Sequence, residues 1–313
     1  MCLSFFRAMC MVPTNCARAF VLLTLAVALS GCSIKTMAIN TVGNALAESG
    51  SNFASDDDPE LIAAAIPFGL KTIEGLLAQS PNHKGLLFAA CSGFTQYSYA
   101  FVQQEADYAE AQDLQKATAM RARAKKLYLR AVDYGMRGFD AEFPGFSVQI
   151  RKDPDAALAK TTKKHVPLLY YTGAAWAAAF AVDVTDSQLS VNQTAMEKMM
   201  RRALALDETW EKGSLHDFFI SWEAGHGGAG GSMEKAREHY AKAKELAAGQ
   251  RVSPLVSYAE SVLVTEQKKK EFEQLLNEAL AFDPDKAAPE QRLANVLAQR
   301  RARWLLSRIE ELF

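Results

Sequence analysis

The chain has 313 residues, of which 49% are hydrophobic and 23% are charged, and its formal net charge is −1. This composition excludes a disordered chain, which would carry fewer apolar residues and more net charge. The near-zero net charge also excludes a nucleic-acid-binding protein that relies on bulk basic charge.

An apolar run near the N-terminus predicts a secretory signal peptide. The run covers residues 19–29, follows Arg7 and Arg18, and is too short to span a bilayer as a helix. Residues 29–32 read LSGC, which resembles the lipobox of bacterial lipoproteins at all four positions. The resemblance implies cleavage before Cys32 and attachment of lipid to its thiol. The alternative is a chance LSGC after an ordinary signal.

The segment after the predicted signal has the composition of a tether, because it mixes small and polar side chains. Ser33 stands where an inner-membrane lipoprotein usually has Asp, so we expect an outer-membrane lipid anchor facing the periplasm. A terminus that carries several acyl chains anchors stably. We therefore divide the chain into a signal peptide at 1–31, a lipid-anchored tether at 32–57 and an all-helical domain at 58–313.

The helical domain is predicted to be all-α. Five of the ten prolines follow an Asp or a Ser, a pattern typical of a helix N-cap with proline in the first turn. These capping residues are Asp58, Ser80, Asp153, Ser253 and Asp283. Apolar residues recur at helical spacing throughout, and no stretch alternates like a strand. The expected helices cover about residues 59–78, 82–104, 107–138, 154–161, 167–183, 190–206, 212–224, 233–248, 254–265, 267–282 and 289–311.

A repeat is visible in the second half of the chain. Residues 202–207 read RALALD, residues 278–283 read EALAFD, and AKELA at 243–247 shares their small-x-x-large pattern. The large apolar residues Leu206, Leu246 and Phe282 are 40 and 36 positions apart. This spacing is close to the period of tetratricopeptide-like (TPR-like) helix pairs, which stack into an array with a concave face.

The glycine-rich segment HGGAGGS at 226–232 could in principle cradle a phosphate. Gly225 and Gly230 have the separation found in a phosphate loop, but Gly231 stands where that loop requires lysine. A phosphate loop should also follow a strand, and the sequence predicts none. We therefore interpret Gly230 and Gly231 as a structural turn between two helices, with Ser232 as the N-cap of the second.

Several segments match a known family pattern. They are GHGGAGGSMEKAREHYAKAKELAAG at 225–249, MRRALALDETWEKGSLHDFF at 200–219, FPGF at 143–146, the stretch 167–176, and RLANVLAQRRARWLLSRIEELF at 292–313. The last segment carries Leu293, Asn295, Gln299, Arg301, Ala302, Trp304, Leu305 and Leu306 of the pattern. Together they resemble the TatT-like family, the T components found with some TRAP transporters, over about residues 60–313.

The resemblance implies a noncatalytic lipoprotein that faces the periplasm and is built from divergent TPR-like helix pairs. It implies association with the solute-binding subunit of a TRAP transporter, an ion-coupled importer of organic acids and related solutes. It also implies a homo-oligomer, for which a trimer is one form, and a cleft or pore that could take a small organic ligand. No cofactor and no nucleic-acid partner come with the resemblance.

Six residues in or near the family-like segments are candidates for lining such a cleft or binding the partner: Trp176, His216, Trp222, Asn295, Arg301 and Trp304. Trp176 lies in an alanine-rich helix, where a core position is the stronger interpretation. Arg301 lies near an apolar stripe, so it either pairs with a buried carboxylate, which we favour, or binds an anionic ligand. The five histidines form no metal motif, and no metal is expected.

Two other functions stay open on the sequence. A lytic transglycosylase-like enzyme would need a catalytic glutamate in a Glu-Ser context, but Glu223 is followed by Ala224. A general envelope-assembly scaffold lipoprotein would use the same helix pairs, and fold alone cannot separate it from a transporter component.

Overall fold

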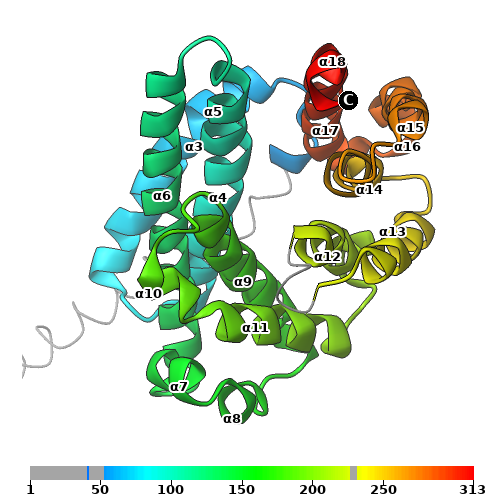
Figure 1. The fold of residues 1–313 in the computed structure, drawn as a ribbon. Helices are drawn as coiled ribbons and strands as arrows, with labels where there is room; N and C mark the ends of the chain where they lie inside the picture. The colour runs from blue at the N-terminus through cyan, green and yellow to red at the C-terminus, as the bar shows by residue number, and fades with distance from the viewer. Residues whose placement is uncertain (1–40, 42–52, 226–230) are drawn as a thin grey trace, which may run out of the picture.

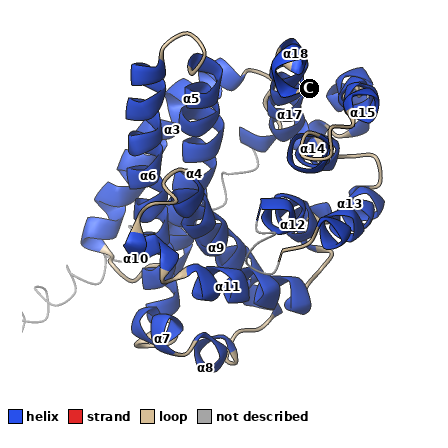
Figure 2. Ribbon diagram, viewed as in Figure 1, coloured by secondary structure: helices blue, strands red, loops and turns tan. Residues whose placement is uncertain are grey.

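The computed structural model describes Thr41 and residues 53–225 and 231–313 (Figure 1). Every regular element in these residues is helical and none is a strand, which confirms the all-α prediction (Figure 2). The predicted signal peptide, Cys32 and Gly230 lie outside the described residues.

The helices fall into two groups along the chain. The first group contains α3 (Pro59–Gln79), α4 (Lys84–Ser98), the π-helical turn η1 (Tyr99–Gln103), α5 (Gln104–Ala109), α6 (Leu114–Asp140), α7 (Phe146–Lys152), α8 (Pro154–Leu158), α9 (Val166–Ala181), α10 (Ser187–Ser190) and α11 (Gln193–Leu206). The second contains α12 (Ser214–Gly225), α13 (Met233–Ala247), α14 (Ser253–Tyr258), the π-helical turn η5 (Ala259–Leu263), α15 (Lys269–Ala281), α16 (Pro284–Ala287), α17 (Arg292–Ser307) and α18 (Ile309–Leu312). Short 3-10 turns join some of them, including η3 (Trp210–Lys212) between the two groups.

The first group is built around α4, α6 and α9, which pack on one another, with α3 on α4 and α11 on α9. Two glycines allow the close helix approaches. A Cβ on Gly135 of α6 would lie 2.1 Å from Thr172 Oγ1 on α9. A Cβ on Gly173 of α9 would lie 2.6 Å from Met200 Sδ on α11. Since protein interiors are close-packed, larger residues at these two positions would force the helices apart.

Helix α3 is long and apolar enough, by length and composition alone, to cross a membrane. Its side chains Ile62, Leu70, Ile73 and Leu77 are nevertheless buried, and the helix packs on α4. We therefore treat α3 as a helix of the body.

The second group has its own core, formed by α14, η5, α15 and α17 around side chains such as Phe272, Leu276 and Leu305. Helix α12 packs on α13 and α14 and connects this core to the first group. These helices lie along the right side of Figure 1. Their arrangement as a regular TPR-like array stays a prediction.

Three of the five predicted caps are confirmed. The carboxylates of Asp58, Asp153 and Asp283 accept backbone N–H groups at the starts of α3, α8 and α16. The other two predictions are wrong. Ser80 ends α3, and the His83 ring caps α4 instead. The Ser253 hydroxyl does not cap α14, because its oxygen accepts a hydrogen bond from Arg251 at 3.0 Å while its O–H donates to Asp217 of α12 at 2.6 Å.

One predicted helix boundary is also wrong. The sequence suggested a break near residues 104–107, but the helix continues through η1 and α5 to Ala109. The break lies at 110–113, where the Asp113 carboxylate accepts the Lys116 N–H at 2.9 Å and so starts α6. The short helices α7, α10 and α16 were not predicted, because one or two turns do not reveal a helical period.

Candidate functional site

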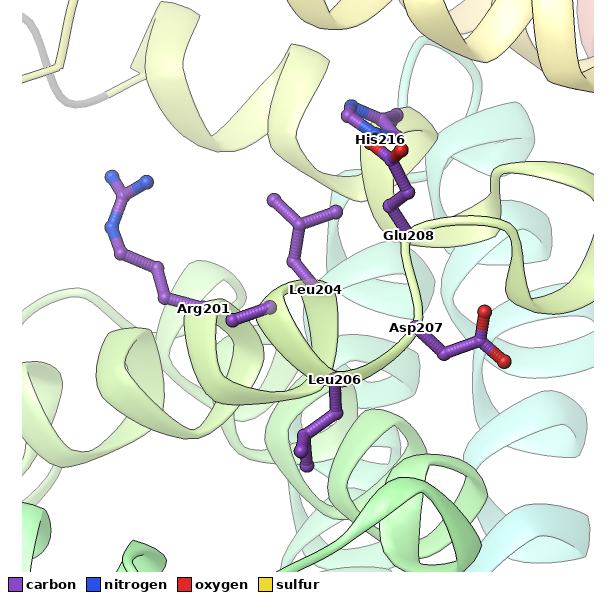
Figure 3. Close-up of a pocket in the computed structure, with 7 residues that line it drawn as sticks. Arg201, Leu204, Leu206, Asp207, Glu208 and His216 are labelled. Atoms are coloured by element: carbon purple, nitrogen blue, oxygen red, sulfur yellow. Dashed lines mark ion pairs between the residues drawn. The ribbon is translucent and has the colours of Figure 1, made fainter.

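An open pocket of about 550 Å³ lies where α11 ends and α12 begins (Figure 3). It is lined by Arg201, Leu204, Ala205, Leu206, Asp207, Glu208 and His216. Of these residues, only His216 was a candidate on the sequence. The pocket has the volume of a site for a small molecule.

The turn that shapes the pocket has an unusual backbone. Glu211, Lys212 and Gly213 all have positive φ angles, of 45°, 53° and 85°. Non-glycine residues rarely adopt this region, and such strain is typical of functional sites. Glycine is required at the third position because a Cβ there would lie 2.9 Å from Leu246 Cβ on α13. The turn therefore directs α12 back over the end of α11 and brings His216 to the pocket.

His216 is buried, with only 9% of its side chain exposed, and it contacts a second histidine. Its Nδ1 lies 2.9 Å from the Nδ1 of His239 on α13. Its Nε2 is buried, makes no hydrogen bond to any described residue, and lies 3.5 Å from Glu208 Oε2.

The electrostatic setting keeps both histidines neutral at neutral pH. Burial lowers the pKa of His216, which Glu208 partly opposes. Burial and the neighbouring His216 lower the pKa of His239 to about 4. Because two lone pairs cannot face each other at this distance, one of the two Nδ1 atoms carries a proton and donates it to the other.

Arg201 forms the other polar side of the pocket. Its Nη2 donates to Glu223 Oε1 at 2.7 Å and its Nε donates to Glu197 Oε1 at 2.7 Å. The guanidinium also lies over the Phe219 ring. Glu223 is fully buried, so it is not placed to contact a polysaccharide as a transglycosylase acid would have to.

Arg301 is the second centre of charge, and the structure gives it an ion-paired role. Its side chain is 11% exposed, its Nε donates to Glu260 Oε2 at 3.1 Å, and its Nη1 donates to Asp107 Oδ2 at 3.0 Å. Its guanidinium carbon lies 4.2 Å from the ring centroid of Trp304, whose ring in turn contacts Tyr108. Arg301 and Trp304 therefore join α17 to η5 and α5, across the seam between the two helix groups.

Both π-helical turns contribute to this seam. Glu260 belongs to η5, and Tyr99 of η1 lies within electrostatic range of Arg301 and Glu260. Tyr99 is 52% exposed although it sits beside these charges. π-helical turns occur frequently at functional sites, so Tyr99 is a candidate that the sequence did not suggest.

The other sequence candidates have structural positions. Trp176 is 2% exposed and packs in the core, the interpretation that its alanine-rich helix favoured. Trp222 is buried and stacks on Phe218. Asn295 is buried, and its side chain accepts the Val252 N–H and donates to the Gln250 carbonyl, both at 3.0 Å. All three side chains are thus used in packing or in internal hydrogen bonds.

The glycine-rich segment is described only from Gly231 onward. Gly231 directly precedes Ser232, whose hydroxyl caps α13 by accepting the Lys235 N–H at 3.4 Å. Among the described residues, no group of three or more His, Cys, Asp or Glu side chains could hold a metal ion.

The sequence did not suggest Arg201 or Glu208, although residues 200–219 were singled out as family-like. Both residues flank the repeat RALALD at 202–207, which indicates a packing helix, and nothing in the spacing shows that α12 folds back over the end of α11. The available signal was the charged turn that contains Gly213, three residues before His216.

Comparison with known proteins agrees with the sequence resemblance. Residues 55–313 match the family model described as TRAP transporter T-component. Over 303 aligned residues the chain is also 28% identical to an uncharacterized protein of Treponema pallidum (strain Nichols), and the aligned region covers 91% of this chain and 94% of that protein. Because the family model covers most of the chain, the chain belongs to the TRAP transporter T-component family.

Proposed function

We propose that this chain is a noncatalytic lipoprotein that docks the solute-binding subunit of a TRAP transporter at the periplasmic side of the cell envelope. Membership of the T-component family carries the proposal, because it gives the chain an accessory role in a TRAP transporter system. The family match leaves the docking surface and the ligand to be assigned from the geometry.

The LSGC motif supports a lipid anchor on Cys32. A chain held to the outer membrane by lipid can meet a periplasmic solute-binding subunit without spanning the membrane itself. Replacing Cys32 by Ala should release the chain from the membrane fraction of its own organism into the soluble fraction. Continued membrane retention of the variant would contradict the lipid anchor.

We assign the docking surface to the seam around Tyr99. Large aromatic rings at a rigid surface are typical binding hot spots. Arg301 and Trp304 hold α17 in place beside this seam through ion pairs and ring contacts, so the surface is ordered before a partner arrives. Preorganisation lowers the entropy cost of binding.

The test uses the full chain, tagged and extracted from its own envelope in a nonionic detergent, with bound proteins identified by mass spectrometry. We expect a TRAP solute-binding subunit, and we expect Tyr99→Ala to reduce its recovery. Phe68→Ala is the matched control, because Phe68 is an exposed aromatic residue on α3. Recovery of an envelope-assembly machine instead would favour the scaffold function. Equal recovery of the solute-binding subunit by the Tyr99→Ala and Phe68→Ala variants would contradict the placement of the docking surface at Tyr99.

A further inference from the structure

Helix α3 presents an apolar face that no described residue covers. One side of the helix packs on α4 and buries Leu70 and Leu77. The opposite side carries Leu61, Ala64 and Phe68, three and four residues apart and therefore on one face. Leu61 is 56% exposed and Phe68 is 79% exposed. Only 22% of the most apolar stretch of α3 is buried, whereas a helix that is apolar on all sides normally lies in a core or in a membrane.

The chemistry of this face suits a lipid surface better than a protein partner. Residues 61–70 read LIAAAIPFGL and contain no side-chain hydrogen-bond donor, acceptor or charge. Specific protein interfaces make about one hydrogen bond per 100–200 Å² and bury about 800 Å² on each partner. Leu61 and Phe68 are the two large exposed side chains of α3, and they supply far less area and no hydrogen bond. The boundary between headgroups and acyl chains of a bilayer accepts an apolar helix face without either.

The chain that leads back to Cys32 joins the body beside this face. Arg292 of α17 donates to the Ser55 carbonyl at 2.9 Å, and the Asp58 carboxylate accepts the Leu61 N–H at 2.9 Å. These bonds fix the last residues before α3 at its first turn, where Leu61 lies. The 25 residues at 33–57 span at most about 90 Å even when fully extended. A lipid on Cys32 would therefore hold α3 at an effective concentration in the millimolar range near the bilayer, so a small apolar patch is sufficient for contact.

From this arrangement we propose that the outer face of α3 rests on the phospholipid bilayer that holds the lipid of Cys32. Phe68 inserts at the boundary between headgroups and acyl chains, with Leu61 and Ala64 beside it. Lys71, one turn further along the same face, is 69% exposed and ion-paired with Glu74, so its long side chain reaches the headgroups. The inference rests on the lipid anchor of the proposed function and adds a second contact that orients the body on the membrane.

The experiment measures the fluorescence of the lipidated full chain in vesicles of phosphatidylethanolamine with a minor share of phosphatidylglycerol. A nitrobenzoxadiazole label is attached to Phe68→Cys. Val191→Cys is the matched control, because Val191 is 75% exposed and follows α10, which packs on α9. The wild-type chain is the labelling blank, since Cys91 is fully buried and burial raises the pKa of its thiol to about 12.

The readout is quenching of the label by a nitroxide near the headgroup end of the lipid acyl chains. We expect the label at Phe68→Cys to be quenched about twofold or more strongly than the label at Val191→Cys, because an interfacial helix face lies at the depth of that nitroxide. The quenching should persist at high salt, since residues 61–70 carry no charge.

Equal quenching of the two labels would overturn the inference, as would its loss at high salt. A label at Phe68→Cys that shifts to the blue without quenching would also overturn it, because that result places Phe68 against protein, such as a second copy of the chain. Phe68 is largely exposed, so its substitution should leave the fold intact.

Flotation of the same vesicles separates the anchor from the α3 contact. A chain that floats with an unquenched label at Phe68→Cys keeps the lipid anchor and contradicts the contact, whereas a chain that does not float contradicts both. The docking experiment is run in detergent without a bilayer, so Phe68→Ala remains its control.

Discussion

The Nδ1 atoms of His216 and His239 lie 2.9 Å apart and join α12 to α13 beside the pocket. The two rings also contact each other, and the His239 ring stacks on Phe219. Protonation of both rings would place an N–H on each Nδ1 and two cations in direct contact, so the Nδ1–Nδ1 hydrogen bond requires at least one neutral ring.

The stability of the chain should therefore depend on pH in the range where histidines titrate. The pKa values of both histidines are lowered in the folded chain, to about 4 for His239, against about 6.5 in the unfolded chain. Below pH 6.5 the folded chain thus binds fewer protons than the unfolded chain, and the free energy of unfolding falls as the pH decreases toward 4. We expect a loss on the order of 1 kcal/mol between pH 7 and pH 5, measured by urea denaturation.

The His239→Phe variant is the control for this pH dependence. Phenylalanine can keep the ring contact with Phe219 but removes one titrating group. The variant should be less stable at pH 7, because His216 Nδ1 loses its partner, and its stability should change less between pH 7 and pH 5. A slope equal to that of the wild type would assign the pH dependence to other groups.

The close approach of α6 and α9 should not tolerate a methyl group. Gly135→Ala would place Cβ 2.1 Å from Thr172 Oγ1, which also donates to the Leu168 carbonyl at 2.6 Å. We expect a destabilisation of about 1–3 kcal/mol from the forced separation of the helices. Gly75→Ala on α3 is the matched control, since a Cβ there has nothing within 4 Å. Its higher helix propensity should make it about 0.5–1 kcal/mol more stable, as measured by urea denaturation.

The fold class could be predicted from the sequence because its signals are local. Asp58 and Asp153 cap helices through backbone groups only three residues away, so the pattern alone was sufficient. Ser253 carries the same local signal but donates to Asp217, 36 positions away, and no local pattern reveals that contact. The prediction was wrong where the side chain takes part in tertiary contacts instead of capping its own helix.

The candidate site shows the same division. The apolar stripe around Arg301 predicted an ion pair, but its partner Asp107 lies 194 positions away. His216 could be singled out from its segment, whereas Glu208 and Arg201 became relevant only when the turn at Gly213 placed them around one pocket. Residue types could be predicted from the sequence, and their juxtaposition required the packing of α11 against α12.

Arg301 should contribute strongly to the stability of the seam. Arg301→Ala would leave Glu260 without its partner and remove the contact with Trp304. We expect a loss of about 2 kcal/mol in the free energy of unfolding, since the variant leaves Glu260 without its partner while water still reaches part of that carboxylate, which is 35% exposed. Arg301→Lys keeps the charge but not the planar fork, so it should lose less. Arg303→Lys, at an exposed position of the same helix, should be close to neutral, and an equal loss in that variant would contradict the assignment.

Asn295 should be required as an amide and not merely as a polar residue. Its oxygen accepts the Val252 N–H and its nitrogen donates to the Gln250 carbonyl, so both halves of the amide are used in a buried position. In Asn295→Asp, a carboxylate oxygen would face the Gln250 carbonyl, and two acceptors would meet without a proton between them. We expect a loss of about 2–3 kcal/mol at pH 7 by urea denaturation, with partial recovery at acidic pH where a protonated Asp can donate. Asn277→Asp, at an exposed position of α15, should change stability little, and a similar loss there would show that added negative charge, rather than the buried amide, is responsible.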